Sequence, residues 1–156
     1  MPTAIKRVLF VCMGNICRSP AGEAVLNRMA AEEEMSIEVE SAGTHGYHIG
    51  EPADARMRSA GQSRGYAFET PSRQVSPSDL AEGRFDLVLA MDRENLAGLR
   101  RLVPDLGEHV RLFSDFTGDE WPTDVPDPYY GGDDGFEYVL DMIEAGCPNV
   151  LRHLED

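Results

Sequence analysis

Apolar and polar residues form two kinds of pattern along this chain, and these patterns predict its secondary structure. Short apolar runs, such as VLFV at 8–11, are typical of strands buried on both faces of a sheet, whereas apolar residues recurring every three or four positions are typical of amphipathic helices. The sequence predicts strands at 5–11, 37–43, 85–91 and 109–113. It predicts helices at 19–35, 52–64, 92–104 and from Phe136 onward.

The order of these elements predicts a fold of the α/β class. Strands that alternate with helices form a parallel sheet with right-handed crossovers, so helices cover both faces. The strand at 37–43 alternates apolar with acidic residues, which indicates a sheet edge. The whole chain, 1–156, is expected to be a single domain, because no repeat, low-complexity tract or linker divides it. A segment at 114–135, rich in Gly, Pro and Asp, is long enough to be functional or disordered.

Composition and charge exclude several classes of protein. No apolar stretch has the length of a membrane span, and the N-terminal apolar run is too short for a signal peptide, so we expect a cytoplasmic location. Three cysteines, an odd number, argue against a disulfide framework and suit a reducing compartment. The formal charge of −14 disfavours binding to nucleic acid or to an anionic membrane, since both need basic patches.

The stretch VLFVCMGNICRSP at 8–20 carries the first candidate chemistry. Cys12 follows the first predicted strand, Gly14 and Asn15 signal a turn, and a helix is expected to open at Arg18. A free cysteine is commonly just a small buried apolar residue. Here, however, loop N–H groups ahead of a helix N-terminus would favour the thiolate and accept a tetrahedral dianion, which Arg18 can grip through two oxygens.

Four separated motifs then resemble one family. They are CMGNICRSP at 12–20, SAGTHGYHIG at 41–50, AMDREN at 90–95 and DPYYGGDDGFEYVLDMIE at 127–144. The chain resembles the low-molecular-weight protein tyrosine phosphatases from its first strand to its last helix. The resemblance implies a four-stranded parallel sheet of order 2-1-3-4, with Cys12 as nucleophile, Arg18 as phosphate clamp and Asp127 as general acid. By itself, Asp127 before Pro128 would be only a turn signal.

The resemblance also implies a binding site and its supports. The phosphate loop would consist of Met13, Gly14, Asn15, Ile16 and Cys17, and the walls of the substrate slot would include Tyr47, Tyr129 and Tyr130. Ser19 is expected to donate a hydrogen bond to the thiolate, to cap the helix, or to do both. Asn15 is expected to lock the loop with Ser41 as a partner, and Asp92 to support the site from behind.

The predicted activity is the hydrolysis of phosphotyrosine in proteins or peptides, by a monomer or weak dimer, without a cofactor. The histidines show no metal-binding spacing, so no metal is expected. A protein arginine phosphatase is an alternative, although the apolar Ile16 favours phosphotyrosine because such relatives carry threonine there. The arsenate reductases share this loop and fold but use two further cysteines as a redox relay. This sequence has no cysteine between Gln62 and Leu112, which argues against that activity. A non-catalytic phosphate-binding module or a phosphocarrier would need no acid such as Asp127.

Cys17 admits two interpretations. It either packs at the start of the helix or traps an oxidised Cys12 as a disulfide before overoxidation becomes irreversible. Both cysteines belong to one short loop, so the sequence leaves the two interpretations open.

Overall fold

The computed structural model describes residues 5–130 and 133–155, with the side chains of all of these except Tyr130 and Asp133. Its four strands form one parallel sheet of order β2-β1-β3-β4. The strands are β1 (Lys6–Cys12), β2 (Ile37–Gly43), β3 (Leu87–Ala90) and β4 (Val110–Leu112). The predicted fold class and strand order are confirmed, and β2 lies at the edge that its alternating pattern indicated.

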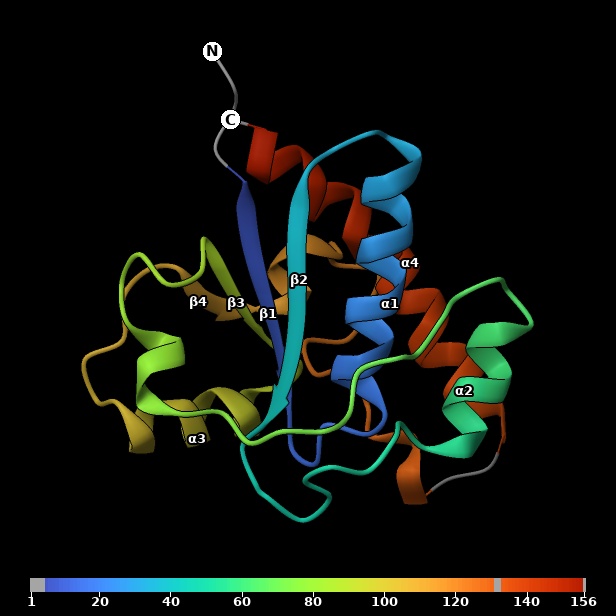
Figure 1. The fold of residues 1–156 in the computed structure, drawn as a ribbon, viewed down its shortest axis with the longest axis horizontal. Helices are drawn as coiled ribbons and strands as arrows, with labels where there is room; N and C mark the ends of the chain where they lie inside the picture. The colour runs from blue at the N-terminus through green and yellow to red at the C-terminus, as the bar shows by residue number, and fades with distance from the viewer. Residues whose placement is uncertain (1–4, 131–132, 156) are drawn as a thin grey trace.

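Helices cover both faces of this sheet, as Figure 1 shows. The four α-helices are α1 (Arg18–Glu32), α2 (Ala55–Gln62), α3 (Arg93–Leu102) and α4 (Asp133–Glu155). Three short 3₁₀ segments are η1 (Pro77–Leu80), η2 (Phe113–Phe116) and η3 (Pro128–Tyr130). Helices α1 and α4 pack side by side on one face, with α2 against α4, whereas α3 covers β3 and β4 from the other face (Figure 1). Within the described ranges, none of these helices has the length and apolar character needed to cross a membrane.

Strand β1 is the centre of both cores. Successive side chains of a strand point to opposite faces, so Phe10 packs in the core under α1 and α4, whereas Leu9 and Val11 pack in the core under α3. All four residues from Val8 to Val11 are fully buried. This two-sided burial explains why the run is continuously apolar, and it fixes the end of β1, where Cys12 lies, between the two helical layers.

Element boundaries differ from prediction where a single residue redirects the backbone. Helix α1 ends at Glu32, before the predicted Met35, because Glu34 adopts a left-handed conformation with φ of 56°. Helix α2 begins at Ala55, after the predicted start, because the Asp54 carboxylate accepts a hydrogen bond from the Arg56 N–H and so caps the helix. The predicted long loop is shortened by η2, η3 and the early start of α4.

Two helical glycines provide a test of this packing. An added Cβ at Gly22 would lie 2.5 Å from the buried Phe10 ring, so Gly22→Ala should lower the free energy of unfolding by about 1–3 kcal/mol. At Gly98 an added Cβ would make ordinary contacts, with Thr44 at 3.4 Å and with Arg101 Nη2 at 3.7 Å, so Gly98→Ala should raise the free energy of unfolding by about 0.5–1 kcal/mol through helix propensity. Urea unfolding of both variants measures the difference. Equal effects would contradict close packing of α1 on β1.

Candidate active site

The loop between β1 and α1 leaves its N–H groups without acceptors. The carbonyl groups of residues 13 and 15–17 each accept a hydrogen bond from outside the loop, from His45 N, Ser72 Oγ, Asp54 N and Ala21 N. The five N–H groups of residues 13–17 donate no hydrogen bond to any residue in the described ranges. Buried N–H groups are almost always paired, so five adjacent free donors next to a thiol form a site for an anion.

Asn15 holds this loop in shape. Its backbone adopts a left-handed conformation with φ of 57°. Its Oδ1 accepts a hydrogen bond from Arg73 N at 2.9 Å, and its Nδ2 donates to Ser19 Oγ at 2.8 Å. The predicted partnership with Ser41 is wrong: Ser41 Oγ donates instead to the buried Glu23 carboxylate, at 2.6 Å. The Asn15 side chain thus lies behind the loop, away from the cavity that a substrate would enter.

Cys12 and Ser19 lie together beneath the loop. Cys12 Sγ and Ser19 Oγ are 3.0 Å apart, which is a hydrogen-bonding distance for sulfur. The interpretation of Ser19 as the helix cap is wrong, because α1 begins at Arg18 and the cap position is Cys17, whose side chain makes no capping bond. The hydroxyl of Ser19 accepts from Asn15 Nδ2, and its single hydrogen has two acceptors within reach, the Cys12 sulfur at 3.0 Å and the Ala42 carbonyl oxygen at 3.4 Å, of which the sulfur is nearer.

Arg18 is buried and forms an ion pair with Asp92. Its Nη1 donates to Asp92 Oδ2 at 2.6 Å and to the Val125 carbonyl oxygen at 3.0 Å, and its Nη2 lies 3.6 Å from Asp127 Oδ2. Burial by itself would lower the pKa of the Arg18 guanidinium, but the Cys12 sulfur and the Asp92 carboxylate outweigh it and raise that pKa. Arg18 is therefore a fixed positive charge whose Nε makes no hydrogen bond within the described residues.

These groups surround a cavity of about 160 Å³ at the carboxyl end of β1. Its lining contains most of the predicted site residues and one that was not predicted, His48: Cys12, Met13, Gly14, Ile16, Cys17, Arg18, Tyr47, His48, Asp127 and Tyr129. Tyr47 is exposed at the mouth and stacks on His45, with ring centroids 5.0 Å apart. The prediction for Tyr130 concerns a side chain outside the described part of the molecule.

Comparison with known proteins identifies the group to which this site belongs. A family model described as "Low molecular weight phosphotyrosine protein phosphatase" matches residues 7–156. The chain belongs to this family. It is 44% identical to the low molecular weight protein-tyrosine-phosphatase of Streptomyces coelicolor, over 96% of this chain and 94% of that protein. The predicted membership and the predicted enzyme class, protein-tyrosine phosphatase, are confirmed.

Solved structures of similar proteins agree with this membership. The crystal structure of YfkJ from Bacillus subtilis is similar with a TM-score of 0.91 at 38% identity, covering 98% of this chain and 96% of that one. The crystal structure of DARP, a Drosophila arginine phosphatase, is similar with a TM-score of 0.87 at 30% identity, covering 96% of this chain and 98% of that one.

The three thiols of this family member differ in their surroundings. Cys12, Cys17 and Cys147 are all free and all buried. Burial raises the pKa of the Cys17 thiol, and the nearby Asp54 carboxylate adds to this rise. Burial likewise raises the pKa of Cys147, which lies inside α4. Neither of these thiols is therefore ionised near neutral pH.

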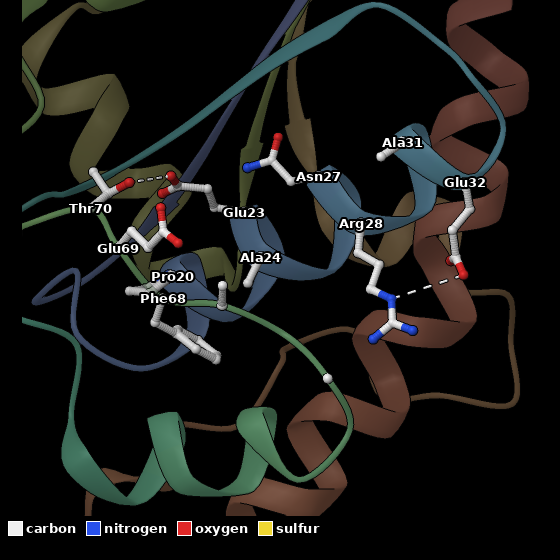
Figure 2. Close-up of a pocket in the computed structure, with 12 residues that line it drawn as sticks. Pro20, Glu23, Ala24, Asn27, Arg28, Ala31, Glu32, Phe68, Glu69 and Thr70 are labelled. Atoms are coloured by element: carbon white, nitrogen blue, oxygen red, sulfur yellow. Dashed lines mark hydrogen bonds and ion pairs between the residues drawn. The ribbon is translucent and has the colours of Figure 1, made fainter.

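A larger hollow lies away from the thiols, between α1 and the segment 65–70 (Figure 2). It has a volume of about 550 Å³, but its charged side chains are largely engaged with one another or with the backbone. Thr70 donates to the Glu23 carboxylate at 2.6 Å, and Arg28 lies between Glu32 and the Arg64 carbonyl group. No cysteine lines it, and no group of three metal-binding side chains occurs anywhere in the ranges that the structure describes. The smaller cavity at Cys12 is therefore the candidate active site of this phosphatase.

Sequence reasoning missed the residues that hold the phosphate loop in place from outside. Ser72 and Arg73 hold Asn15 from a segment with no regular secondary structure, and Asp54 and Arg56 contact the loop and η3 from the start of α2. The one local signal was at Asp54, a favoured capping residue just before a helix. The other contacts join segments more than 35 residues apart and leave no local pattern.

Removing the Asn15 side chain tests how the conformation of the phosphate loop is maintained. Asn15→Ala should lower the free energy of unfolding by about 1–3 kcal/mol, because Ser19 and Arg73 N lose a buried partner. Affinity for inorganic phosphate should fall by about tenfold or more, which is 1.4 kcal/mol or more of binding free energy. Titration calorimetry and urea unfolding measure both.

Asn15→Gly is the matched control, because glycine accepts the left-handed backbone but lacks the side chain. It should bind phosphate as weakly as Asn15→Ala. Phosphate affinity equal to that of the unmodified protein would show that the backbone conformation alone shapes the loop.

Proposed function

We propose that this chain hydrolyses phosphotyrosine in proteins or peptides through a phosphate ester on Cys12. The observation that carries the proposal is the row of five N–H groups, those of residues 13–17, that have no acceptor among the described residues and lie next to a buried thiol and the Arg18 guanidinium. Such an arrangement suits the three equatorial oxygens of a phosphoryl group in transfer, where stabilisation of charge and positioning supply most of the catalysis.

In the first step, Cys12 Sγ attacks phosphorus in line with the bond to the tyrosine oxygen. The S–P bond forms while the P–O bond breaks, and the electron pair of that bond leaves with the tyrosine oxygen, which takes a proton from Asp127. Arg18 and the loop N–H groups neutralise the charge on the equatorial oxygens. A hydrogen bond donated by Ser19 to Sγ, at 3.0 Å, stabilises the thiolate before attack and improves it as a leaving group afterwards.

In the second step, water attacks phosphorus and the S–P bond breaks, returning its electron pair to sulfur. Asp127, now ionised, accepts a proton from the water and is ready to act as an acid again. Its location supports both roles, because it lines the cavity from the segment opposite the loop and its Oδ1 accepts a hydrogen bond from Tyr129 N at 3.0 Å.

Aromatic and apolar walls support an aryl phosphate as the substrate. Ile16, Tyr47 and Tyr129 line the cavity, and the two tyrosine side chains are exposed at its mouth. They offer apolar and aromatic surface to a phenyl ring. The similarity to the Drosophila arginine phosphatase keeps phosphoarginine as the alternative substrate.

Parallel assays with three phosphopeptides test the substrate class. Peptides that differ only in carrying phosphotyrosine, phosphoarginine or phosphoserine should give rapid phosphate release from phosphotyrosine alone. Chelation by EDTA should leave the rate unchanged. Cys12→Ser should abolish turnover, because the serine hydroxyl is not ionised at neutral pH. Faster release from phosphoarginine, or turnover by Cys12→Ser, would overturn the proposal.

The acid role of Asp127 predicts a dependence on the leaving group. Asp127→Ala should lower kcat/KM by about 10²-fold or more for phenyl phosphate, whose leaving oxygen needs a proton. The loss should be much smaller for p-nitrophenyl phosphate, whose phenolate leaves unprotonated. Equal losses for the two substrates would remove Asp127 from the acid role.

The two interpretations of Cys17 predict different responses to peroxide. If Cys17 traps oxidised Cys12, then activity lost to peroxide returns with dithiothreitol, and Cys17→Ala loses that recovery because Cys12 is oxidised beyond the sulfenic acid. We expect trapping to be slow, since the raised pKa of Cys17 keeps it protonated. Equal recovery in both proteins would leave Cys17 with a packing role alone.

A further inference from the structure

Arg56 lies between the phosphate loop and the segment that carries Asp127. It is the second residue of α2, and its guanidinium binds the Asp54 carboxylate through two nitrogens, with Nε 3.2 Å from Oδ1 and Nη2 3.1 Å from Oδ2. A two-pronged pair of this kind fixes the plane of the guanidinium, so Arg56 has a defined direction even though its side chain is partly exposed.

On one side, this pair is anchored to the phosphate loop. The backbone N–H of Asp54 donates to the Ile16 carbonyl oxygen at 2.8 Å. The Asp54 side chain is only 11% exposed. Burial alone would raise the pKa of Asp54, but the hydrogen bonds from Arg56 outweigh it and lower that pKa. The Asp54 carboxylate is therefore ionised and holds Arg56 at neutral pH.

On the other side, Arg56 reaches the segment of Asp127. Its Nη2 also donates to the Tyr129 carbonyl oxygen at 3.1 Å, and its guanidinium lies over the rings of Tyr129 and Phe136, at 5.4 Å and 4.8 Å from their centroids. The N–H of the same Tyr129 donates to Asp127 Oδ1. Tyr129 thus accepts a hydrogen bond from Arg56 at its carbonyl oxygen and donates one to Asp127 from its N–H.

We propose that Arg56 is a positioning residue that sets the location of the Asp127 carboxyl group relative to Cys12 and the phosphate loop. The inference rests on the proposed role of Asp127 as general acid. An acid must come within hydrogen-bonding reach of the leaving oxygen, and a displacement of about 1 Å can cost up to about 10²-fold in rate. The chain from Ile16 through Asp54, Arg56 and Tyr129 to Asp127 supplies that restraint across more than 100 residues of sequence.

The test measures kcat/KM for a series of aryl phosphates whose phenols differ in pKa. This ratio contains only the steps up to departure of the phenol, where the acid acts. Arg56→Met keeps an unbranched side chain that reaches the position of Nε, but it removes the guanidinium and with it every donor. It should lower kcat/KM by about tenfold for phenyl phosphate and much less for p-nitrophenyl phosphate, as expected for a displaced acid.

Arg111→Met is the matched control. Arg111 also pairs with one aspartate, Asp115, and lies over one phenylalanine, Phe116, at 4.8 Å, but it belongs to β4 and contacts none of the described residues that line the cavity. It should leave the dependence on the leaving group unchanged. The conservative variant Arg56→Lys keeps the charge but loses the two-pronged geometry, so it should reproduce part of the effect of Arg56→Met. Full activity in Arg56→Lys would assign the effect to charge and overturn positioning.

The double variant separates this inference from the proposed function. If Arg56 acts through Asp127, then Arg56→Met should cause no further loss for phenyl phosphate in an Asp127→Ala background. A further tenfold loss there, or equal losses for both substrates in Arg56→Met alone, would overturn the inference and leave the acid role standing. If Asp127→Ala itself shows no dependence on the leaving group, the proposed acid fails, and the role of Arg56 fails with it.

Discussion

The rest of the site depends on one constraint, which is that the five adjacent N–H groups of residues 13–17 have no acceptor in the described part of the chain. A folded chain normally pairs such groups, so nearby oxygen atoms must be engaged elsewhere. Four of the five carbonyl groups in the loop 13–17 accept a hydrogen bond from outside the loop, and the donors are His45 after β2, Ala21 of α1, Asp54 before α2 and Ser72 before η1. The Asn15 side chain is bound to Arg73 N and Ser19. The free donors are therefore the result of many bonds made outside the cavity.

The parallel sheet makes this arrangement possible. Strand β1 is buried on both faces and delivers Cys12 to the edge where all four strands end. The end of β2 passes so close to the loop that a Cβ at Gly43 would lie 2.9 Å from the Met13 carbonyl oxygen. The end of β3 leads to Asp92, which accepts from Arg18 and also caps α3 by accepting from Asn95 N. The ends of β2 and β3 thus each restrain the site next to Cys12, and Gly43 allows the close approach of β2.

Charge in the site is balanced by specific pairs, although the chain as a whole is strongly acidic. Arg18 is buried, so it needs a partner, and the Asp92 carboxylate provides one while leaving Nε without a hydrogen bond in the described part of the chain. Arg56 and Asp54 form a second pair outside the cavity, between Ile16 of the loop and Tyr129. The net charge of −14 repels an anionic ligand at long range, so affinity for such a ligand must come from contacts at short range.

Local sequence determined the strands, the helices, and the succession of Cys12, turn and Arg18, because burial pattern and turn chemistry act between residues close along the chain. The tertiary structure decided which distant side chains complete the site. The prediction of Ser41 as the partner of Asn15 failed because Ser41 donates to Glu23, a contact between β2 and α1. Ser72, Arg73, His48 and Arg56 lie in loops or at a helix start, where no periodic pattern marks them. Their hydrogen bonds and contacts arise only when sheet edge, loops and helices pack together, since such pairings depend on distance in space and not along the sequence.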